Sequence, residues 1–168
     1  MLGFRSIAPP IVAAMPLTPG AKAPDFTLLD QHGEPFSLSK SLKQRKARHL
    51  IYFYPKADTP GCTTQACGLR DVLGDIGDAV VVGISPDAPE KQAAFDTKFS
   101  LGFPLISDED HGVAEAYGTW GERSMYGRTF MGIIRSAFLV AEDGTIADAW
   151  YKISPADTPK RLLAALNA

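Results

Sequence analysis

Long hydrophobic runs, net charge and cysteine are all scarce in this sequence of 168 residues. No run approaches the roughly 20 consecutive apolar residues that a membrane-spanning helix needs, so we expect no insertion into a membrane. A formal net charge of −2 gives no field that would collect phosphates, which argues against nucleic acid as a partner. The length fits a single domain, and no internal repeat is visible.

The two cysteines lie close together, at Cys62 and Cys67. Two are too few for a disulfide-stapled secreted scaffold, and we expect a cytoplasmic protein. A bond between them would close a very short loop and stabilise the fold little, so the pair suits reversible chemistry better. Zinc needs three or four ligands, and the three histidines, His32, His49 and His111, are too scattered in the sequence to complete a set.

The N-terminal segment differs in character from the rest of the chain. We expect residues 1–16 to form a flexible arm and residues 17–168 to form the domain. The first fourteen residues combine one arginine with an apolar stretch that two prolines interrupt, which makes a poor signal peptide. An upstream start before the second methionine, Met15, is the alternative.

Apolar segments of strand length alternate with segments of helical character, which predicts an α/β sandwich with a central mixed sheet and helices on both sides. Residues 118–132 form a long stretch that carries glycine and aromatic residues, and no helix or strand is assigned to them. Thr158 is expected to cap the last helix, with Pro159 at its first position. The expected strands are 26–29, 35–38, 49–54, 79–85, 103–107, 133–140 and 145–151, and the expected helices are 39–46, 62–76, 86–99, 112–117 and 159–166.

The segment from Pro55 to Cys62 joins an expected buried strand to an expected helix. A cysteine at this point directs its sulfur at the helix N-terminus, where free N–H groups and the positive end of the dipole stabilise an anion. Because the thiolate is the nucleophilic form, Cys62 has the surroundings of a reactive sulfur. A single cysteine is more often a small buried hydrophobe. The stiffening Pro55, the hydroxyl of Thr59 and the open approach at Gly61 favour reactivity here.

Pro55, Thr59 and Cys62 together match the P-x-x-x-[T/S]-x-x-C signature of the peroxiredoxins. The longer string from Phe53 to Cys67 resembles the bacterioferritin comigratory protein, or peroxiredoxin Q, branch of that family. Residues 22–28 resemble the family's opening, and residues 133–139 resemble the strand that carries its arginine. The resemblance therefore covers roughly residues 20–151.

This resemblance implies a thioredoxin-like fold with an N-terminal β-hairpin, and a thiol-dependent peroxidase that reduces hydrogen peroxide and organic (alkyl) hydroperoxides. It implies that Cys62 is the peroxidatic cysteine and that Cys67 resolves it through an intramolecular disulfide, with Pro55, Thr59 and Arg135 completing the site. It further implies thioredoxin as the reductant, a monomer, and no metal or organic cofactor.

The reaction moves charge from sulfur to the leaving oxygen, so hydrogen-bond donors must surround both ends. We assign Arg135 to hold the thiolate and the peroxide through its guanidinium fork, and Thr59 to hydrogen-bond the sulfur or the peroxide. The backbone N–H of Cys62 is assigned to an oxygen of the peroxide. Four aromatic residues are interpreted either as walls of the pocket or as core: Tyr54, Trp120, Tyr126 and Phe130.

The spacing of the two cysteines poses a geometric problem. Five residues of a continuous α-helix place two Cα atoms about 8.7 Å apart. A disulfide usually needs Cα atoms within roughly 6.8 Å. We therefore hypothesise that the helix unwinds by at least a turn after Cys62 becomes a sulfenic acid, so that Cys67 can condense with it.

Two other functions remain open at this point. A thiol–disulfide oxidoreductase would normally carry C-x-x-C at the helix start, whereas the spacing here is C-x₄-C. A non-catalytic binding module could use the same pair as a redox switch, and turnover of peroxide with a dithiol would distinguish it from an enzyme. The chain also departs from the usual family pattern at Gln65, where glutamate is frequent, at Ala137, where threonine is usual, and at Met131, where polar residues are common.

Overall fold

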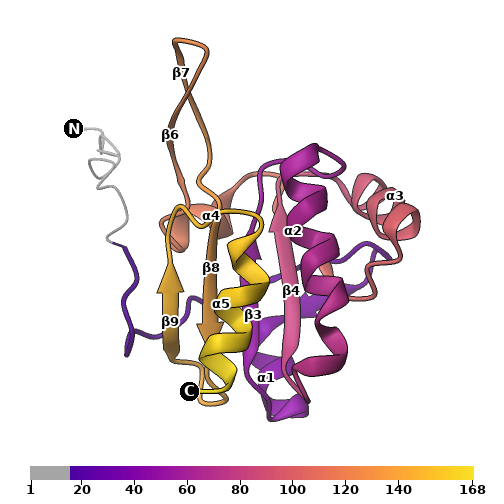
Figure 1. Cartoon of the computed structure of the whole chain (residues 1–168), viewed down its shortest axis with the longest axis vertical. Helices are drawn as coiled ribbons and strands as arrows, with labels where there is room; N and C mark the ends of the chain where they lie inside the picture. Colours follow the sequence, from indigo (N-terminus) through magenta and orange to yellow (C-terminus); the bar gives the residue numbers. More distant parts are fainter. Residues whose placement is uncertain (1–15) are drawn as a thin grey trace, which may run out of the picture.

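A computed structural model describes residues 16–168, and its centre is a five-stranded mixed sheet (Figure 1). The strand order is β5-β4-β3-β8-β9; β3, β4 and β5 are parallel, β8 is antiparallel to β3, and β9 is antiparallel to β8. The strands are β3 (His49–Phe53), β4 (Val80–Ser85), β5 (Leu105–Ser107), β8 (Ser136–Val140) and β9 (Ile146–Trp150).

Helices cover both faces of this sheet. One face carries α2 (Pro60–Asp71), α3 (Pro89–Phe99) and α5 (Asp157–Leu166), and the other carries α1 (Leu38–Arg45) and α4 (Gly112–Ala116). A short 3-10 turn, η1 (Leu73–Asp75), follows α2. Alternate residues of β3 therefore enter two separate cores: Leu50 and Tyr52 pack toward α2, whereas Ile51 and Phe53 pack toward α1 and α4.

The central strand β3 is buried along its whole length, which explains its nearly continuous apolar sequence. Its first residue, His49, has both ring nitrogens in hydrogen-bond contact, Nε2 with Ser41 Oγ at 2.6 Å and Nδ1 with Ala47 O at 2.9 Å. Burial lowers the pKa of His49 because it disfavours the charged ring. The neutral histidine thus links the start of β3 to α1 and to the residues just before the strand through its two hydrogen-bond contacts.

Two antiparallel hairpins are attached to the sandwich. The first pairs β1 (Thr27–Leu29) with β2 (Pro35–Ser37), as expected for the N-terminal hairpin. The second pairs β6 (Trp120–Met125) with β7 (Arg128–Ile133) and extends away from the body of the molecule (Figure 1). Its turn places Tyr126 and Gly127 at φ 52° and 74°, the positive values of a turn whose twist suits a two-residue hairpin.

The predicted α/β architecture, the central mixed sheet and the N-terminal hairpin are confirmed. One hairpin was not predicted, and two local predictions are wrong. Residues 118–132 contain most of the β6–β7 hairpin. The expected strand 133–140 is interrupted after Ile133, and β8 begins only at Ser136, because Arg135 leaves the sheet. The last helix begins at Asp157, so Thr158 lies inside it and does not cap it.

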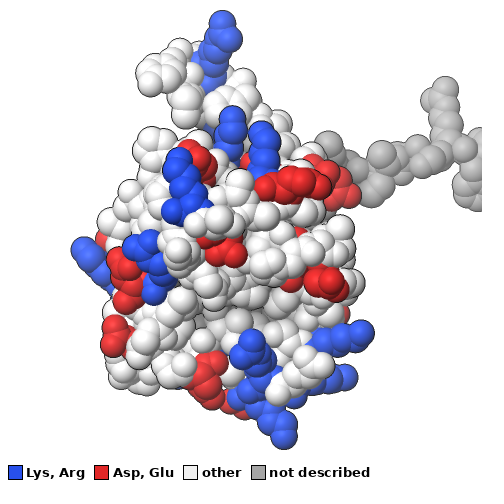
Figure 2. Space-filling view, turned by 90° about the vertical axis from the view of Figure 1, so that its right-hand side faces the viewer, with Lys and Arg blue, Asp and Glu red and all other residues white. Residues whose placement is uncertain are grey.

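Charged side chains of both signs are interspersed over the face seen in Figure 2, with a group of Lys and Arg at its lower end, the level at which Figure 1 shows α1. Lys43 and Arg45 lie in the last turn of that helix, where cations complement the negative end of the dipole. In the described residues, no helix has the length and apolar character required to cross a membrane. The expected N-terminal arm, 1–16, lies outside the described residues except for Pro16.

Candidate active site

Cys62 lies in the first turn of α2, just beyond the carboxyl end of β3. Thr59 is the N-cap residue in extended conformation, and Pro60 occupies the first helical position, where its missing N–H costs nothing. The intrahelical ladder starts with Thr63 N–H donating to Thr59 O at 2.8 Å. The N–H groups of Gly61 and Cys62 precede that bond and face the open end of the helix. Cys62 as a whole residue is only 1% exposed.

Arg135 reaches the sulfur from the break between β7 and β8. Its Nη2 donates to Cys62 Sγ at 3.5 Å, and its Nη1 donates to Gln65 Oε1 at 2.6 Å. The backbone is held on both sides, since Ile134 N–H donates to Thr119 O at 2.7 Å and Ile153 N–H donates to Arg135 O at 3.0 Å. The structure thus brings together two residues that are 73 positions apart in the sequence.

Gly61 makes room for this guanidinium. A Cβ atom at this position would lie 3.1 Å from Arg135 Nη2 and 3.5 Å from Pro155 Cγ. A side chain here would therefore press on the group that contacts the sulfur. The glycine that the sequence suggested for close approach of a substrate also admits the arginine.

Pro55 and Thr59 belong to the loop that joins β3 to α2. Thr59 Oγ1 donates to Lys56 O at 2.7 Å, so its proton is used within the loop and its oxygen remains an acceptor. The loop is tied to neighbouring elements, because Ala57 N–H donates to Asp87 Oδ2 at 2.7 Å and Lys98 pairs with Asp58 at 3.0 Å. Both Pro55 and Thr59 are half-buried beside the helix start.

Cys67 lies in the same continuous helix as Cys62 and is half-buried. Both cysteines are free thiols within the described part of the chain. A continuous helix keeps the two Cα atoms about 8.7 Å apart, beyond the usual disulfide range of roughly 6.8 Å. The arrangement is that of a reduced site in which the two sulfurs cannot yet bond.

Of the four aromatic residues considered as walls, Tyr54 lies in the core beneath α2. Its hydroxyl donates to Gln92 Oε1, and burial raises its pKa. Trp120 stacks on His111 with ring centroids 3.7 Å apart. Tyr126 is 97% exposed at the hairpin tip and is neither wall nor core, and Phe130 on the same hairpin is also exposed.

Gln65 and Thr158 were not assigned to the site from the sequence. Gln65 is fully buried, and besides accepting from Arg135 its Nε2 donates to Thr158 Oγ1 at 2.9 Å. Thr158 in turn donates to Ser154 O at 3.0 Å. Gln65 could have been found from the sequence, because residues three positions apart in a helix lie on the same face and Gln65 follows Cys62 by three. Thr158 gave none, because it is 93 positions away.

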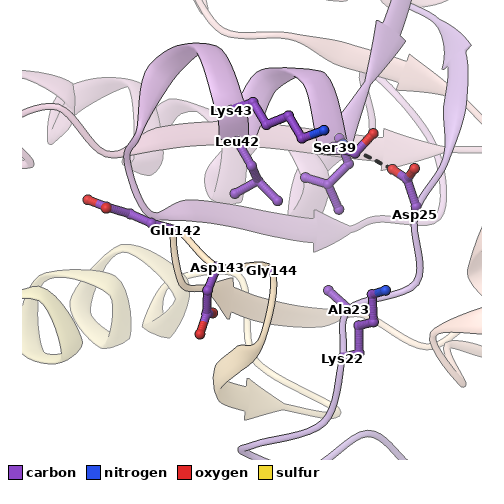
Figure 3. A pocket seen from close by; sticks show the side chains of 10 residues that line it. Lys22, Ala23, Asp25, Ser39, Leu42, Lys43, Glu142, Asp143 and Gly144 are labelled. Carbon is purple, nitrogen blue, oxygen red and sulfur yellow. Dashed lines mark hydrogen bonds between the residues drawn. The ribbon is translucent and has the colours of Figure 1, made fainter.

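A pocket of about 310 Å³ lies at the other end of the sheet and shares no lining residue with this site (Figure 3). It is formed by the segment leading to β1, by α1 and by the turn between β8 and β9. Lys22, Asp25, Lys43 and Asp143 line it, and Asp25 Oδ1 accepts from Ser39 N–H at 3.0 Å. Cations and carboxylates of this mixed kind do not single out one ligand.

Comparison with known proteins relates the chain to a family. A family model described as AhpC/TSA matches residues 19–149. The putative peroxiredoxin bcp of Haemophilus influenzae is 54% identical over 144 residues, which are 84% of this chain and 91% of that protein. Peroxiredoxin Bcp of Escherichia coli is 52% identical over 133 residues, 78% of this chain and 83% of that protein.

Solved structures with the same fold belong to the same group. The bacterioferritin comigratory protein of Xanthomonas campestris, described for its alkyl peroxide reduction activity, superposes with a TM-score of 0.77 at 32% identity, covering 92% of this chain and 97% of that one. The peroxidoxin BcpB of Mycobacterium tuberculosis gives a TM-score of 0.77 at 33% identity, covering 90% of this chain and 97% of that one. The thioredoxin-like fold expected from the sequence is confirmed by these matches.

Proposed function

Because the chain belongs to the AhpC/TSA family and is a peroxiredoxin, a thiol-dependent peroxidase, we propose that Cys62 is the nucleophile that attacks the peroxide. The observation that carries this proposal is the contact of Arg135 Nη2 with Cys62 Sγ at 3.5 Å in the first turn of α2. A cation and a helix N-terminus both favour an anion at that sulfur. The alternative functions, an oxidoreductase or a non-catalytic switch, have no comparable observation in their favour.

In the first reaction, the Cys62 thiolate forms a bond to one oxygen of the hydroperoxide, and the O–O bond breaks. The other oxygen takes a proton and leaves as water or an alcohol, and the sulfur becomes a sulfenic acid. Negative charge moves onto the leaving oxygen, where the fork of Arg135 and the N–H of Cys62 supply donors. We expect these donors to bind the transition state more tightly than the substrate.

Thr59 and Pro55 orient the peroxide in this proposal. With its proton donated to Lys56 O, Thr59 Oγ1 accepts a hydrogen bond from the hydroperoxide O–H and holds that same oxygen toward the sulfur, so that the other oxygen is the leaving group. The half-buried Pro55 fixes the first residue of the loop and limits the access of water to the buried sulfur of Cys62. Neither residue is required to change its protonation state.

The thiolate of Cys67 then attacks the sulfenic sulfur of Cys62, and hydroxide leaves and is protonated to water. The continuous helix between the two cysteines must unwind first, because their Cα atoms are too far apart for the bond. A dithiol protein returns both cysteines to thiols by disulfide exchange. We propose thioredoxin as that protein, hydrogen peroxide and alkyl hydroperoxides as substrates, and a cytoplasmic monomer as the working form.

A coupled assay tests this function directly. The protein is mixed with thioredoxin, thioredoxin reductase and NADPH, and NADPH consumption is followed after addition of hydrogen peroxide or an alkyl hydroperoxide. We expect many turnovers per chain. Oxidation that stops after one equivalent of peroxide, with reduced thioredoxin in excess, would instead support the redox-switched module.

A further inference from the structure

The segment that runs from the β9–α5 connection into the first turn of α5 lies against α2 at three points along one helix face. Both glycines face a proline ring closely: a Cβ atom added to Gly61 would lie 3.5 Å from Pro155 Cγ, and one added to Gly68 would lie 3.1 Å from Pro159 Cγ. Between these two contacts, Thr158 Oγ1 accepts the hydrogen bond of Gln65 Nε2. Residues 61, 65 and 68 are spaced by four and three positions, so they share one face of the helix.

This segment, Ser154–Pro159, is here called the α5 clamp. Figure 1 shows α5 beside α2 on the same face of the sheet, and contacts between the two helices agree with that view. The central contact is the most sheltered one, since Gln65 is 0% and Thr158 1% exposed. The backbone carbonyl of Ser154 fixes the threonine hydroxyl from behind. The clamp therefore holds α2 over the stretch that contains both cysteines.

The clamp opposes the motion that the disulfide requires. Gln65 lies between Cys62 and Cys67, so unwinding of that turn removes its amide from Thr158. A buried hydrogen bond that is made only in the wound helix stabilises the wound form relative to the unwound one. Its loss favours unwinding, since the freed Gln65 amide is hydrated once the helix opens.

We propose that the α5 clamp, through Thr158, sets the rate at which oxidised Cys62 is resolved by Cys67. This inference rests on the proposed peroxidase function. Two reactions compete for the sulfenic acid. Attack by the Cys67 sulfur gives the disulfide and water, whereas a second hydroperoxide oxidises Cys62 to the sulfinic acid and leaves as an alcohol or water. A tighter clamp keeps α2 wound for longer and directs more of the sulfenic acid to the second reaction.

The test compares two buried threonines. Thr158→Val removes the clamp hydroxyl and keeps the side-chain shape. Thr119→Val is the matched control, because Thr119 is also buried and its hydroxyl donates to Ala114 O at 3.1 Å, away from α2. Thr158→Ser keeps the hydroxyl and should restore wild-type behaviour. Pro159→Ala, at a half-buried position, loosens the contact with Gly68 without exposing a buried polar group, and it serves if Thr158→Val does not fold.

Each protein is reduced, mixed with one equivalent of hydrogen peroxide, quenched with an alkylating reagent at intervals and analysed by peptide mass spectrometry. We expect the Cys62–Cys67 disulfide to form roughly fivefold faster in Thr158→Val, the factor that follows from the modest net value of one hydrogen bond. Pro159→Ala should show a smaller acceleration, and Thr119→Val and Thr158→Ser should match wild type. In excess peroxide, the sulfinic acid fraction should fall in the same order.

Amide hydrogen exchange of the reduced proteins supplies an independent readout. Thr158→Val should exchange faster in residues 62–70 and not in β3, whereas Thr119→Val should leave α2 unchanged. Equal disulfide rates in wild type, Thr158→Val and Pro159→Ala would overturn the clamp and leave the peroxidase intact. A wild-type protein that consumes peroxide without any Cys62–Cys67 disulfide would overturn both proposals.

Discussion

At its carboxyl end, β3 leads through a short loop to Cys62, whereas at its amino end the first residue, His49, is itself buried. Both ends hold polar side chains away from water. At the amino end, the contacts of His49 with Ser41 Oγ and Ala47 O use both ring nitrogens. At the carboxyl end, Arg135 donates to Gln65 and also to a sulfur at an open helix terminus.

The difference between the two ends lies in what the polar groups face. His49 contributes to stability, because both of its ring nitrogens are hydrogen-bonded to neighbouring parts of the chain and neither is free to react. Arg135 serves the chemistry, because one arm of its fork meets a nucleophile and the other arm is anchored. Substitutions at the carboxyl end should therefore change activity, and substitutions at the amino end should change stability alone.

The largest effect is expected at the nucleophile. Cys62→Ser should abolish peroxidase turnover, because a serine hydroxyl stays protonated at neutral pH and is a far weaker nucleophile. Cys67→Ser is the matched substitution in the same helix. It should block recycling by thioredoxin and still allow one oxidation per chain, measured as loss of one equivalent of peroxide. Full turnover by Cys62→Ser would show that the carboxyl end of β3 does not carry the nucleophile.

The second effect concerns the cation at the same end. Arg135→Met should lower the rate constant of the first oxidation by roughly a hundredfold or more, the usual cost of removing one preorganised donor from a transition state. Arg128→Met provides the control, since Arg128 is exposed on the β6–β7 hairpin. Stopped-flow measurement of the single oxidation isolates this step from recycling. Comparable losses in both variants would show that only overall charge matters.

At the amino end, His49 should respond to pH in stability and not in activity. Burial lowers its pKa below the ordinary 6.5, so the unfolded chain takes up a proton before the folded one does. The stability is complete above about pH 6.5 and is lost as the pH falls toward the folded pKa. Urea denaturation between pH 7.5 and 5.5 should show a steeper loss in wild type than in His49→Gln, by at most about 1.4 kcal/mol per pH unit.

Peroxidase activity of His49→Gln at pH 7.5 should stay within about twofold of wild type, because the residue is at the far end of the strand from Cys62. Equal pH slopes in the two proteins would indicate that His49 is not held neutral by the fold. A large loss of activity would show that His49 influences the active site at the opposite end of β3, which would contradict the separate roles assigned to the two ends.

The smallest effect is expected in the β6–β7 hairpin. Tyr126→Ser changes a side chain that is 97% exposed, so the free energy of unfolding should change by less than about 0.5 kcal/mol. Turnover with hydrogen peroxide should be unchanged. Thermal unfolding and the coupled assay check both values. A marked loss of turnover would show that the active end of the molecule extends into the hairpin.

The sequence patterns predicted the elements whose residues are buried against the sheet. The apolar run of β3 identifies a strand covered on both faces, and the motif from Pro55 to Cys62 identifies the helix start. These patterns are local, since each depends on a few consecutive residues. The N-terminal hairpin was predictable for the same reason.

The β6–β7 hairpin was missed because most of its β7 side chains are exposed, which removes the alternation that predicts a strand. Its turn also starts with Tyr126 at positive φ, where asparagine, aspartate or glycine is the usual signal. The break before Ser136 was missed because apolar residues of strand character flank Arg135 and Ser136 on both sides. Only the position of Cys62 explains why Arg135 turns out of the sheet.

Within the site, the motif supplied Pro55, Thr59 and Cys62, and the family resemblance supplied Arg135. The support of Arg135 by Gln65 and Thr158 could not be predicted, because it joins α2 to α5 across the fold. A lone threonine before a proline in a helical segment looks like a cap. Its true partner is visible only in the tertiary structure.

The central claim is that Cys62 is the atom that peroxide oxidises, and peptide mass spectrometry tests it most directly. Reduced wild-type protein is treated with one equivalent of hydrogen peroxide without a reductant, alkylated and digested. We expect a disulfide between Cys62 and Cys67 in wild type and a sulfenic acid on Cys62 in Cys67→Ser. Consumption of peroxide while Cys62 remains fully alkylated as a free thiol would contradict it.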